Sequence, residues 1–209
     1  MAANIEYVIA RGIFATYGYF VIDPETRHGF LIDPGAQPEM FLQVIRDNGW
    51  MIEKILLTHG HMDHMGAADA LRQALGAPVY AHTESDRYLL NPDLNLSAQY
   101  GIPFTLEGAR KFRGGDTIAL EAAPDVALRV EHVPGHTDDS CMFVYEPGGT
   151  AFVGDTIYQG GPGLTNFPTG NAHKLATSIR DKVLILPREM ELCSGHSGPI
   201  TVAEFARAL

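Results

Sequence analysis

Short apolar runs recur along the chain, and turn-forming residues separate them. Each run has three or four residues, and Val, Ile, Phe and Tyr are frequent in them. Runs of this length between Gly, Pro, Asp and Asn are typical of buried strands. The pattern predicts strands at residues 7–9, 19–22, 30–32, 55–57, 78–80, 127–130, 142–145 and 151–153. The turn Glu146-Pro147-Gly148-Gly149 separates the last two runs and predicts a hairpin.

Apolar residues spaced three and four apart predict helices between these strands. The first helix begins at Pro38 and ends at Gly49, residues that favour a helix start and a helix end. The four predicted helices span about residues 38–49, 67–75, 172–184 and 202–208. The stretch from Thr83 to Gly115 contains several Gly and Pro turns and predicts part helix, part loop. Strands and helices mixed in this way predict an α+β fold, a layered α/β sandwich.

Composition and charge exclude several classes of protein. The chain has 209 residues, of which 45% are hydrophobic and 19% charged, so it is not a disordered chain. We expect one domain over residues 1–209, because no linker is evident. The net charge of −10 argues against nucleic acid or an anionic membrane as the main partner. We also expect no secretory signal, no membrane helix and no disulfide framework, and hence a cytoplasmic protein.

A cluster of metal-binding residue types lies in the segment His59-Gly60-His61-Met62-Asp63-His64. It follows a predicted strand and precedes a helix expected to begin near Met65, so it occupies a strand-to-helix loop. In an extended stretch, the side chains of His59 and His61 point the same way. Asp63 and His64 then face a second point, and two metal ions roughly 3.5–4 Å apart would fit that division.

Three further candidate ligands each follow a glycine and a strand-like run: His136, Asp155 and His196, the last of these after the run at residues 191–193. A glycine lets backbone and ligand approach closely, because it has no Cβ. The combined set of five imidazoles and two carboxylates suits zinc, iron or manganese. Because it contains no thiolate, the set argues against a closed structural zinc site.

The ordered motifs His-x-His-x-Asp-His, Gly-His, Gly-Asp and Gly-His resemble those of the metallo-β-lactamase superfamily. They run from about Ile5 to the end of the chain. The segments Leu31–Gly35, Pro134–Thr137 and Val153–Thr156 resemble the short, glyoxalase II-like (hydroxyacylglutathione hydrolase-like) branch. The resemblance implies a four-layer αββα sandwich, with the metals at one edge between two sheets.

The resemblance also implies a role for each candidate residue. His59, His61 and His136 hold one metal, Asp63, His64 and His196 hold a second, and Asp155 bridges the two. The cofactors are then two divalent ions, zinc first, with iron or manganese as alternatives, and a hydroxide between them is the nucleophile. Asp63 and Asp155 are the expected catalytic carboxylates, and Asp33 and Thr58 orient the ligands. Candidate substrate contacts are Tyr158, Asn166 and Lys174.

Chemistry favours hydrolysis of a small thioester, such as an S-acylglutathione, or a related ester. A thiol with a pKa of about 8.5 leaves as a thiolate without a general acid, whereas an amide usually needs a proton donor. Two features depart from the resemblance. Leu164 and Asn166 stand where many relatives have Arg and Asp. We also expect no C-terminal glutathione-binding domain, because 209 minus 196 leaves 13 residues after His196.

Two other functions remain open at this level. One is a persulfide dioxygenase with a single iron, and the other is a metal-binding module without turnover. Lactonase and β-lactamase activity would depend on loops such as Gly160–Gly170. The partner is expected to be a small molecule, with the metal, the acyl group, the thiol carrier and the oligomeric state left open.

Overall fold

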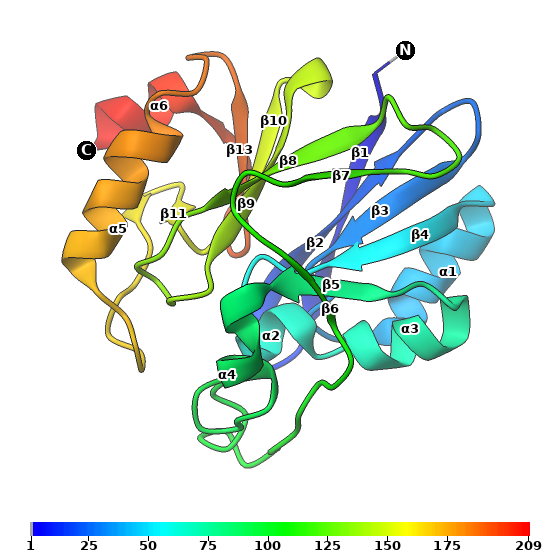
Figure 1. Cartoon of the computed structure of the whole chain (residues 1–209), viewed down its shortest axis with the longest axis horizontal. Coiled ribbons are helices and arrows are strands. Elements are labelled where there is room, and N and C mark those ends of the chain that lie inside the picture. The colour runs from blue at the N-terminus through cyan, green and yellow to red at the C-terminus, as the bar shows by residue number, and fades with distance from the viewer. Residues whose placement is uncertain (1) are drawn as a thin grey trace.

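Two six-stranded sheets stacked face to face form the centre of the molecule (Figure 1). The computed structural model describes residues 2–209. The first sheet has the strand order β1-β2-β3-β4-β5-β6. Its strands are β1 (Asn4–Arg11), β2 (Ala15–Ile22), β3 (His28–Ile32), β4 (Met51–Leu56), β5 (Val79–His82) and β6 (Arg110–Phe112). The first three strands are antiparallel, and β3 to β6 are parallel.

The second sheet is built from the C-terminal half of the chain and has the order β14-β13-β10-β9-β8-β7. Its strands are β7 (Thr117–Ala119), β8 (Ala127–His132), β9 (Cys141–Tyr145), β10 (Thr150–Gly154), β13 (Glu191–Ser194) and β14 (Ile200–Thr201). A separate two-stranded ribbon pairs β11 (Ile157–Tyr158) with β12 (Gly161–Pro162). The predicted hairpin is confirmed, because β9 and β10 pair antiparallel across a short 3₁₀ turn at Glu146–Gly148.

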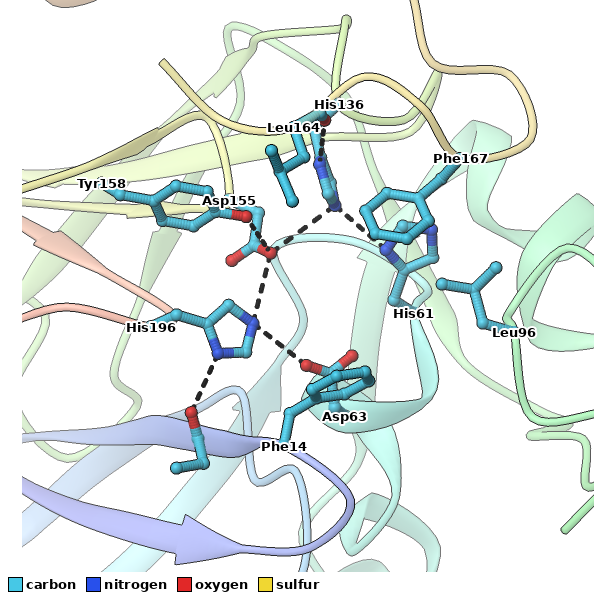
Figure 2. Close-up of a pocket in the computed structure, with 11 residues that line it drawn as sticks. Phe14, His61, Asp63, Leu96, His136, Asp155, Tyr158, Leu164, Phe167 and His196 are labelled. Carbon is cyan, nitrogen blue, oxygen red and sulfur yellow. Dashed lines mark hydrogen bonds and ion pairs between the residues drawn. The ribbon is translucent and has the colours of Figure 1, made fainter. Parts of the chain in front are cut away.

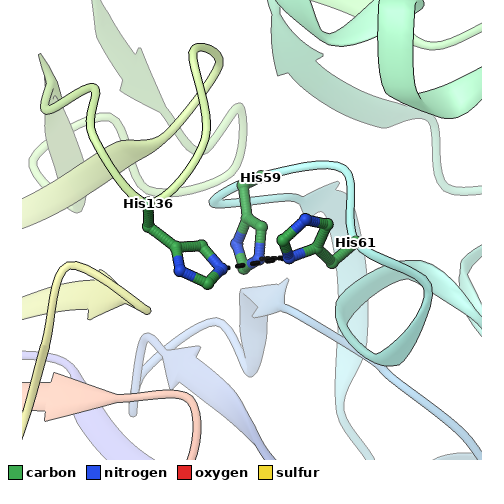
Figure 3. A group of neighbouring side chains, drawn as sticks. All are labelled: His59, His61 and His136. Carbon is green, nitrogen blue, oxygen red and sulfur yellow. Dashed lines mark hydrogen bonds between the residues drawn. The ribbon is translucent and has the colours of Figure 1, made fainter. Parts of the chain in front are cut away.

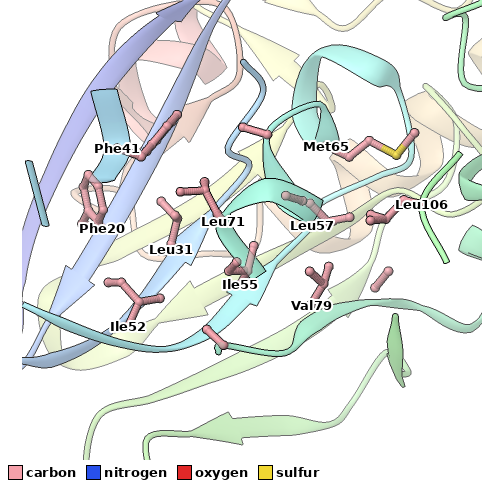
Figure 4. Packing of buried hydrophobic residues seen from close by; sticks show 14 of the residues in the cluster. Phe20, Leu31, Phe41, Ile52, Ile55, Leu57, Met65, Leu71, Val79 and Leu106 are labelled. Carbon is pink, nitrogen blue, oxygen red and sulfur yellow. The ribbon is translucent and has the colours of Figure 1, made fainter. Parts of the chain in front are cut away.

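Helices cover the outer face of each sheet. Helices α1 (Pro38–Asn48) and α3 (Ala68–Leu75) pack on the first sheet, where they contact a core that includes the strand residues Phe20, Leu31 and Ile55 (Figure 4). Helices α5 (Ala172–Ser178) and α6 (Val202–Ala208) pack on the second sheet. Two shorter helices are α2 (Met62–Met65) and α4 (Asp86–Leu89), the latter preceded by a 3₁₀ turn at Thr83–Ser85.

Alternation along the strands produces the layers. In β2, Tyr19 and Val21 point between the sheets, whereas Phe20 faces α1 and α3. In β9, Phe143 points between the sheets and Val144 faces the second pair of helices. Strands that bury both faces need continuous apolar runs, as this chain has. The predicted αββα sandwich is therefore confirmed.

Three local predictions differ from the structure. The helix expected over 172–184 ends as an α-helix at Ser178 and continues as a π-helical turn over Ile179–Val183. The helix expected near Met65 is two helices, α2 and α3. The stretch 83–115 also contains β6, a three-residue edge strand that no periodic pattern could reveal.

Cys141 and Cys193 are buried and unpaired, as expected of small apolar side chains in the core. Within residues 2–209, no helix is long and apolar enough to cross a membrane. The single domain and the cytoplasmic location stay predictions.

Candidate metal centre

The loop that follows β4 brings four candidate ligands to one edge of the first sheet. Strand β4 ends at Leu56, the chain bends at Thr58 and His59, and α2 begins at Met62. The expectation of an extended stretch is therefore wrong at this bend. His59 and His61 still converge, because His59 Nε2 lies 3.1 Å from His61 Nδ1.

The other three candidates come from loops of the second sheet. His136 follows β8, Asp155 follows β10 and His196 follows β13. His136 Nε2 lies 3.0 Å from His61 Nδ1, so three imidazole rings meet at one point (Figure 3). The structure thus brings together all seven residues that the motifs singled out.

Backbone carbonyls orient two of these histidines. His136 Nδ1 lies 2.7 Å from the Leu164 carbonyl oxygen, and His196 Nδ1 lies 2.9 Å from that of Ala15. A carbonyl can only accept a hydrogen bond, so Nδ1 carries the proton that is donated. In the neutral ring, Nε2 then presents its lone pair to the centre, which is the form that binds a metal.

Asp33 and Thr58 orient two more ligands. Asp33 accepts hydrogen bonds from the Thr58 amide (2.8 Å) and the Thr58 hydroxyl (2.6 Å). The same carboxylate lies 2.9 Å from His64 Nδ1, and Thr58 Oγ1 lies 3.2 Å from His59 Nδ1. Asp33 has a φ of 51°, a left-handed backbone conformation that is uncommon outside glycine, and local strain of this kind clusters at functional sites.

Asp155 contacts ligands of both expected metals (Figure 2). Its Oδ1 lies 3.3 Å from His64 Nε2, and its Oδ2 lies 3.3 Å from His196 Nε2 and 3.6 Å from His136 Nε2. Tyr158 donates its hydroxyl hydrogen to Oδ2 at 2.8 Å. Asp155 therefore occupies the position that a bridging carboxylate needs.

The donor atoms fit a metal site. The sets His59/His61/His136, His59/His64/Asp155 and Asp63/His64/His196 each place three ligand atoms within 4.8 Å of one another. In residues 2–209, the buried side-chain nitrogen and oxygen atoms without a hydrogen-bond partner are His61 Nε2, His64 Nε2, Asp155 Oδ1 and Thr156 Oγ1. Buried polar atoms rarely stay unsatisfied. A bound cation would supply the partner that His64 Nε2 and Asp155 Oδ1 lack.

Glycine is required beside His196. A Cβ built at Gly195 would lie 2.4 Å from His64 Cε1 and 2.5 Å from Asp155 Oδ1. At Gly154 the φ is 51°, and a Cβ would lie 2.4 Å from Thr58 Oγ1. The predicted close approach to candidate ligands is confirmed at Gly195, whereas Gly154 approaches Thr58 and Gly135 approaches the Leu175 backbone.

Electrostatics divides the centre into two halves. Burial lowers the pKa of His59 well below 6.5, and it lowers the pKa of His61 to about 3. On the other side, burial opposes protonation of His196, but hydrogen bonds to Asp155 and Asp63 outweigh it and raise the pKa to about 10. Carboxylates raise the pKa of His64 against burial in the same way. Nearby opposite charge thus overcomes desolvation on one side only.

A cavity of about 340 Å³ opens onto the centre. Tyr158 lines it, whereas Asn166 is exposed on the loop beyond and is not among its lining residues. Lys174 also lies outside this cavity, and its Nζ binds Asp138 Oδ1 at 2.8 Å. The cavity is lined by Phe14, Ala15, His61, Asp63, Leu96, His136, Asp155, Tyr158, Leu164, Phe167 and His196.

Sequence reasoning missed several residues at this site. Phe14, Leu96 and Phe167 line the cavity from three separate loops. Asp139 is fully buried and accepts hydrogen bonds from the Thr137 and Ser85 hydroxyls at 2.7 Å each. The available signal was a second acidic residue directly after the His136-Thr137-Asp138 segment, in a loop expected to lie at the metals.

Comparisons with known proteins agree with this geometry. A family model described as the metallo-β-lactamase superfamily matches residues 12–196. The hydroxyacylglutathione hydrolase GloC of Haemophilus influenzae is 31% identical over 187 residues, covering 88% of this chain and 87% of that protein. The BLEG-1 B3 metallo-β-lactamase superposes with a TM-score of 0.89 at 29% identity, covering 96% of this chain and 95% of that chain. TTHA1623, solved in a di-iron-bound form, has a TM-score of 0.85 at 31% identity, covering 97% and 98%.

Proposed function

This chain belongs to the metallo-β-lactamase superfamily of metal-dependent hydrolases, and from that premise we propose that it hydrolyses a small thioester, or a related ester, at a dinuclear metal site. The resemblance found in its motifs is confirmed by the family match. The observation that carries the proposal is the position of Asp155, whose two oxygens contact ligands from both sets. A similar protein has been solved with two irons, which supports two metals here.

The chain's own residues prepare the site for this reaction. His59, His61 and His136 would hold one ion, Asp63, His64 and His196 the other, and Asp155 both. When bound, two divalent ions lower the pKa of water and stabilise negative charge that develops on a carbonyl oxygen. Leu164, Ala15 and Asp33 fix the ring orientations, so little reorganisation is needed during reaction.

A thioester substrate suits this site because its hydrolysis needs no general acid. Hydrolysis forms a C–O bond, breaks the C–S bond and yields a carboxylate and a thiol. A thiol of pKa about 8.5 leaves as a thiolate, so the chain needs no general acid at this position. The hydroxyl of Tyr158 is engaged by Asp155, and burial together with that carboxylate raises its pKa, so it stays protonated. The similarity to a hydroxyacylglutathione hydrolase supports the same substrate class.

The test combines metal content with turnover. Protein purified without added metal is analysed for its elements, and thioester absorbance is followed with S-lactoylglutathione and with an S-acyl N-acetylcysteamine. We expect close to two metals per chain and loss of at least one thioester. His136→Ala should lower metal content and rate, whereas His173→Ala, an exposed histidine outside the centre, should change neither.

Two results would overturn the proposal. One iron per chain, with oxygen consumed on a persulfide and no thioester loss, would identify a dioxygenase. Bound metal without turnover of any ester, thioester, lactam or lactone would identify a binding module.

A further inference from the structure

A second cavity lies next to the one that opens onto the metal centre. The two cavities have volumes of about 340 Å³ and 310 Å³, and both are lined by Phe14 and Asp63. We call them the front chamber and the rear chamber. Together they have the size of a small-molecule site, which typically measures about 300–1,000 Å³.

Phe14 stands at the boundary between the chambers. It ends the turn between β1 and β2, and 37% of its surface is exposed. Its ring meets that of Tyr100 edge-on, with centroids 5.2 Å apart, and its centroid lies 6.4 Å from that of His196. The next residue, Ala15, holds His196 through its carbonyl oxygen. Phe14, which separates the two chambers, is therefore the neighbour in sequence of the residue whose carbonyl orients His196.

Apolar side chains form the walls of both chambers. Leu96, Leu164 and Phe167 line the front chamber, and Phe167 lies 5.5 Å from the His61 ring, centroid to centroid (Figure 2). The rear chamber is lined by Ile13, Ile102 and Phe104. Several of these residues expose much of their surface although they are large and apolar: Leu164 53%, Ile102 51% and Ile13 44%. Covering these exposed apolar side chains with an apolar ligand group lowers the free energy of the complex.

The ionisable residues around the two chambers also favour an uncharged ligand. Across residues 2–209, the ionisable groups lining either chamber are candidate metal ligands and Tyr158. Two cations outside the chambers, Lys174 and Arg87, are both paired with Asp138. Among the described residues, no lysine or arginine lines either chamber, so a terminal anion on a substrate arm away from the metal ligands would lose its hydration without gaining an ion pair with a side chain.

We propose that the two chambers hold an uncharged thioester or ester with an apolar arm on each side of the reacting carbonyl, one arm in each chamber and Phe14 between them. This inference rests on the proposed function and names its substrate class. It excludes a multiply charged carrier such as glutathione as the preferred thiol.

The test is a matched series of substrates. S-acetyl, S-butanoyl and S-hexanoyl esters of one neutral thiol are compared with the ω-carboxylate of the longest acyl chain. We expect kcat/KM to rise up to about fourfold per methylene until a chamber is full. The terminal carboxylate should lower kcat/KM at least tenfold, and S-lactoylglutathione should be the poorer substrate.

Variants locate the effect. Leu164→Lys places a cation at the front chamber and should remove most of the discrimination against the carboxylate, while the unchanged backbone carbonyl still orients His136. Leu90→Lys changes an equally exposed leucine outside both chambers and should keep the wild-type selectivity. Phe14→Ala joins the chambers and should raise the relative rate of branched acyl groups.

Binding separates this inference from the proposed function. Ketone analogues, in which CH₂ replaces the thioester sulfur, cannot be hydrolysed, and their binding is measured by calorimetry with and without metal. Tighter binding of the neutral analogue without thioester turnover would support the chambers and reject the hydrolase. Turnover combined with equal or better binding of the carboxylate analogue would reject the chambers and keep the hydrolase.

Discussion

The two halves of the candidate metal centre differ in what sets the protonation state of their histidines. His59, His61 and His136 form an imidazole half, in which each residue is at most 2% exposed and burial holds the pKa down. Asp63, His64 and His196 form a carboxylate half, in which His196 keeps 25% of its side chain exposed. Its ion pairs with Asp63 (3.0 Å) and Asp155 (3.3 Å) favour the protonated ring.

The difference shows what each half requires. With no metal bound, protonated histidine balances the carboxylates of this half, and a metal ion would replace that proton. The imidazole half cannot do so, since three neutral rings present nitrogen atoms to one point at distances near 3 Å. It therefore depends more strongly on a cation. Asp155 contacts members of both halves, so we expect it to couple them.

The largest effect should follow from removing that coupling. We expect Asp155→Ala to lose metal from both halves and to lower kcat/KM by about 10³-fold, because both sets lose a negatively charged ligand at once. Elemental analysis and turnover on the same preparation measure the two effects. A variant that keeps two metals and stays within tenfold of wild type would show that the halves are independent.

A second comparison separates the halves. His61→Ala should abolish tight binding in the imidazole half, because its residues are at most 2% exposed and water does not reach the position of the lost nitrogen. His196→Ala should leave one metal bound and lower kcat/KM by about 10²-fold, because water can reach the more exposed position. Equal metal loss in the two variants would contradict the asymmetry. Full activity of His196→Ala with one iron would favour the dioxygenase.

Much of this site could be predicted from the sequence, because four of its candidate ligands form one cluster and the others each follow the end of a strand by a few residues. The apolar runs also predicted the layers, since strands buried on both faces leave a continuous signal. The backbone carbonyls that orient His136 and His196 left no such signal, unlike the side chains of Asp33 and Thr58. His196 and Ala15 are 181 residues apart, and His136 and Leu164 are 28 apart, so only the packed fold brings them together.

Backbone contacts are hidden for a further reason. A carbonyl oxygen is present at every residue, so nothing in the identity of Ala15 or Leu164 marks it as an acceptor. Short elements were missed because three residues, as in β6 and β7, are too few to show a period. Phe14 was missed because it lies in a turn, where one aromatic residue carries no pattern.

The smallest expected effect concerns a residue that supports the imidazole half alone. Asp139 lies against Gly60, between His59 and His61, where a Cβ would be 3.3 Å from Asp139 Oδ2, and burial raises the pKa of Asp139 from 3.8 to about 6. The folded state therefore favours the protonated acid. Its contribution to the free energy of unfolding is fully present below pH 3.8 and is lost as the pH rises through about 6.

Asp139→Asn should remove this dependence while it keeps a carbonyl oxygen as acceptor. Relative to the variant, the wild type should lose at most about 3 kcal/mol of unfolding free energy between pH 4 and pH 7, since one pKa unit is worth 1.36 kcal/mol. Urea unfolding with chelator present measures the difference. Asp138→Asn is the matched control with the opposite sign, because Lys174 and Arg87 lower the pKa of Asp138 and its contribution is lost as the pH falls. If the difference in unfolding free energy between the wild type and Asp139→Asn does not change with pH, then Asp139 supports the His59–His61 loop without carrying a buried charge.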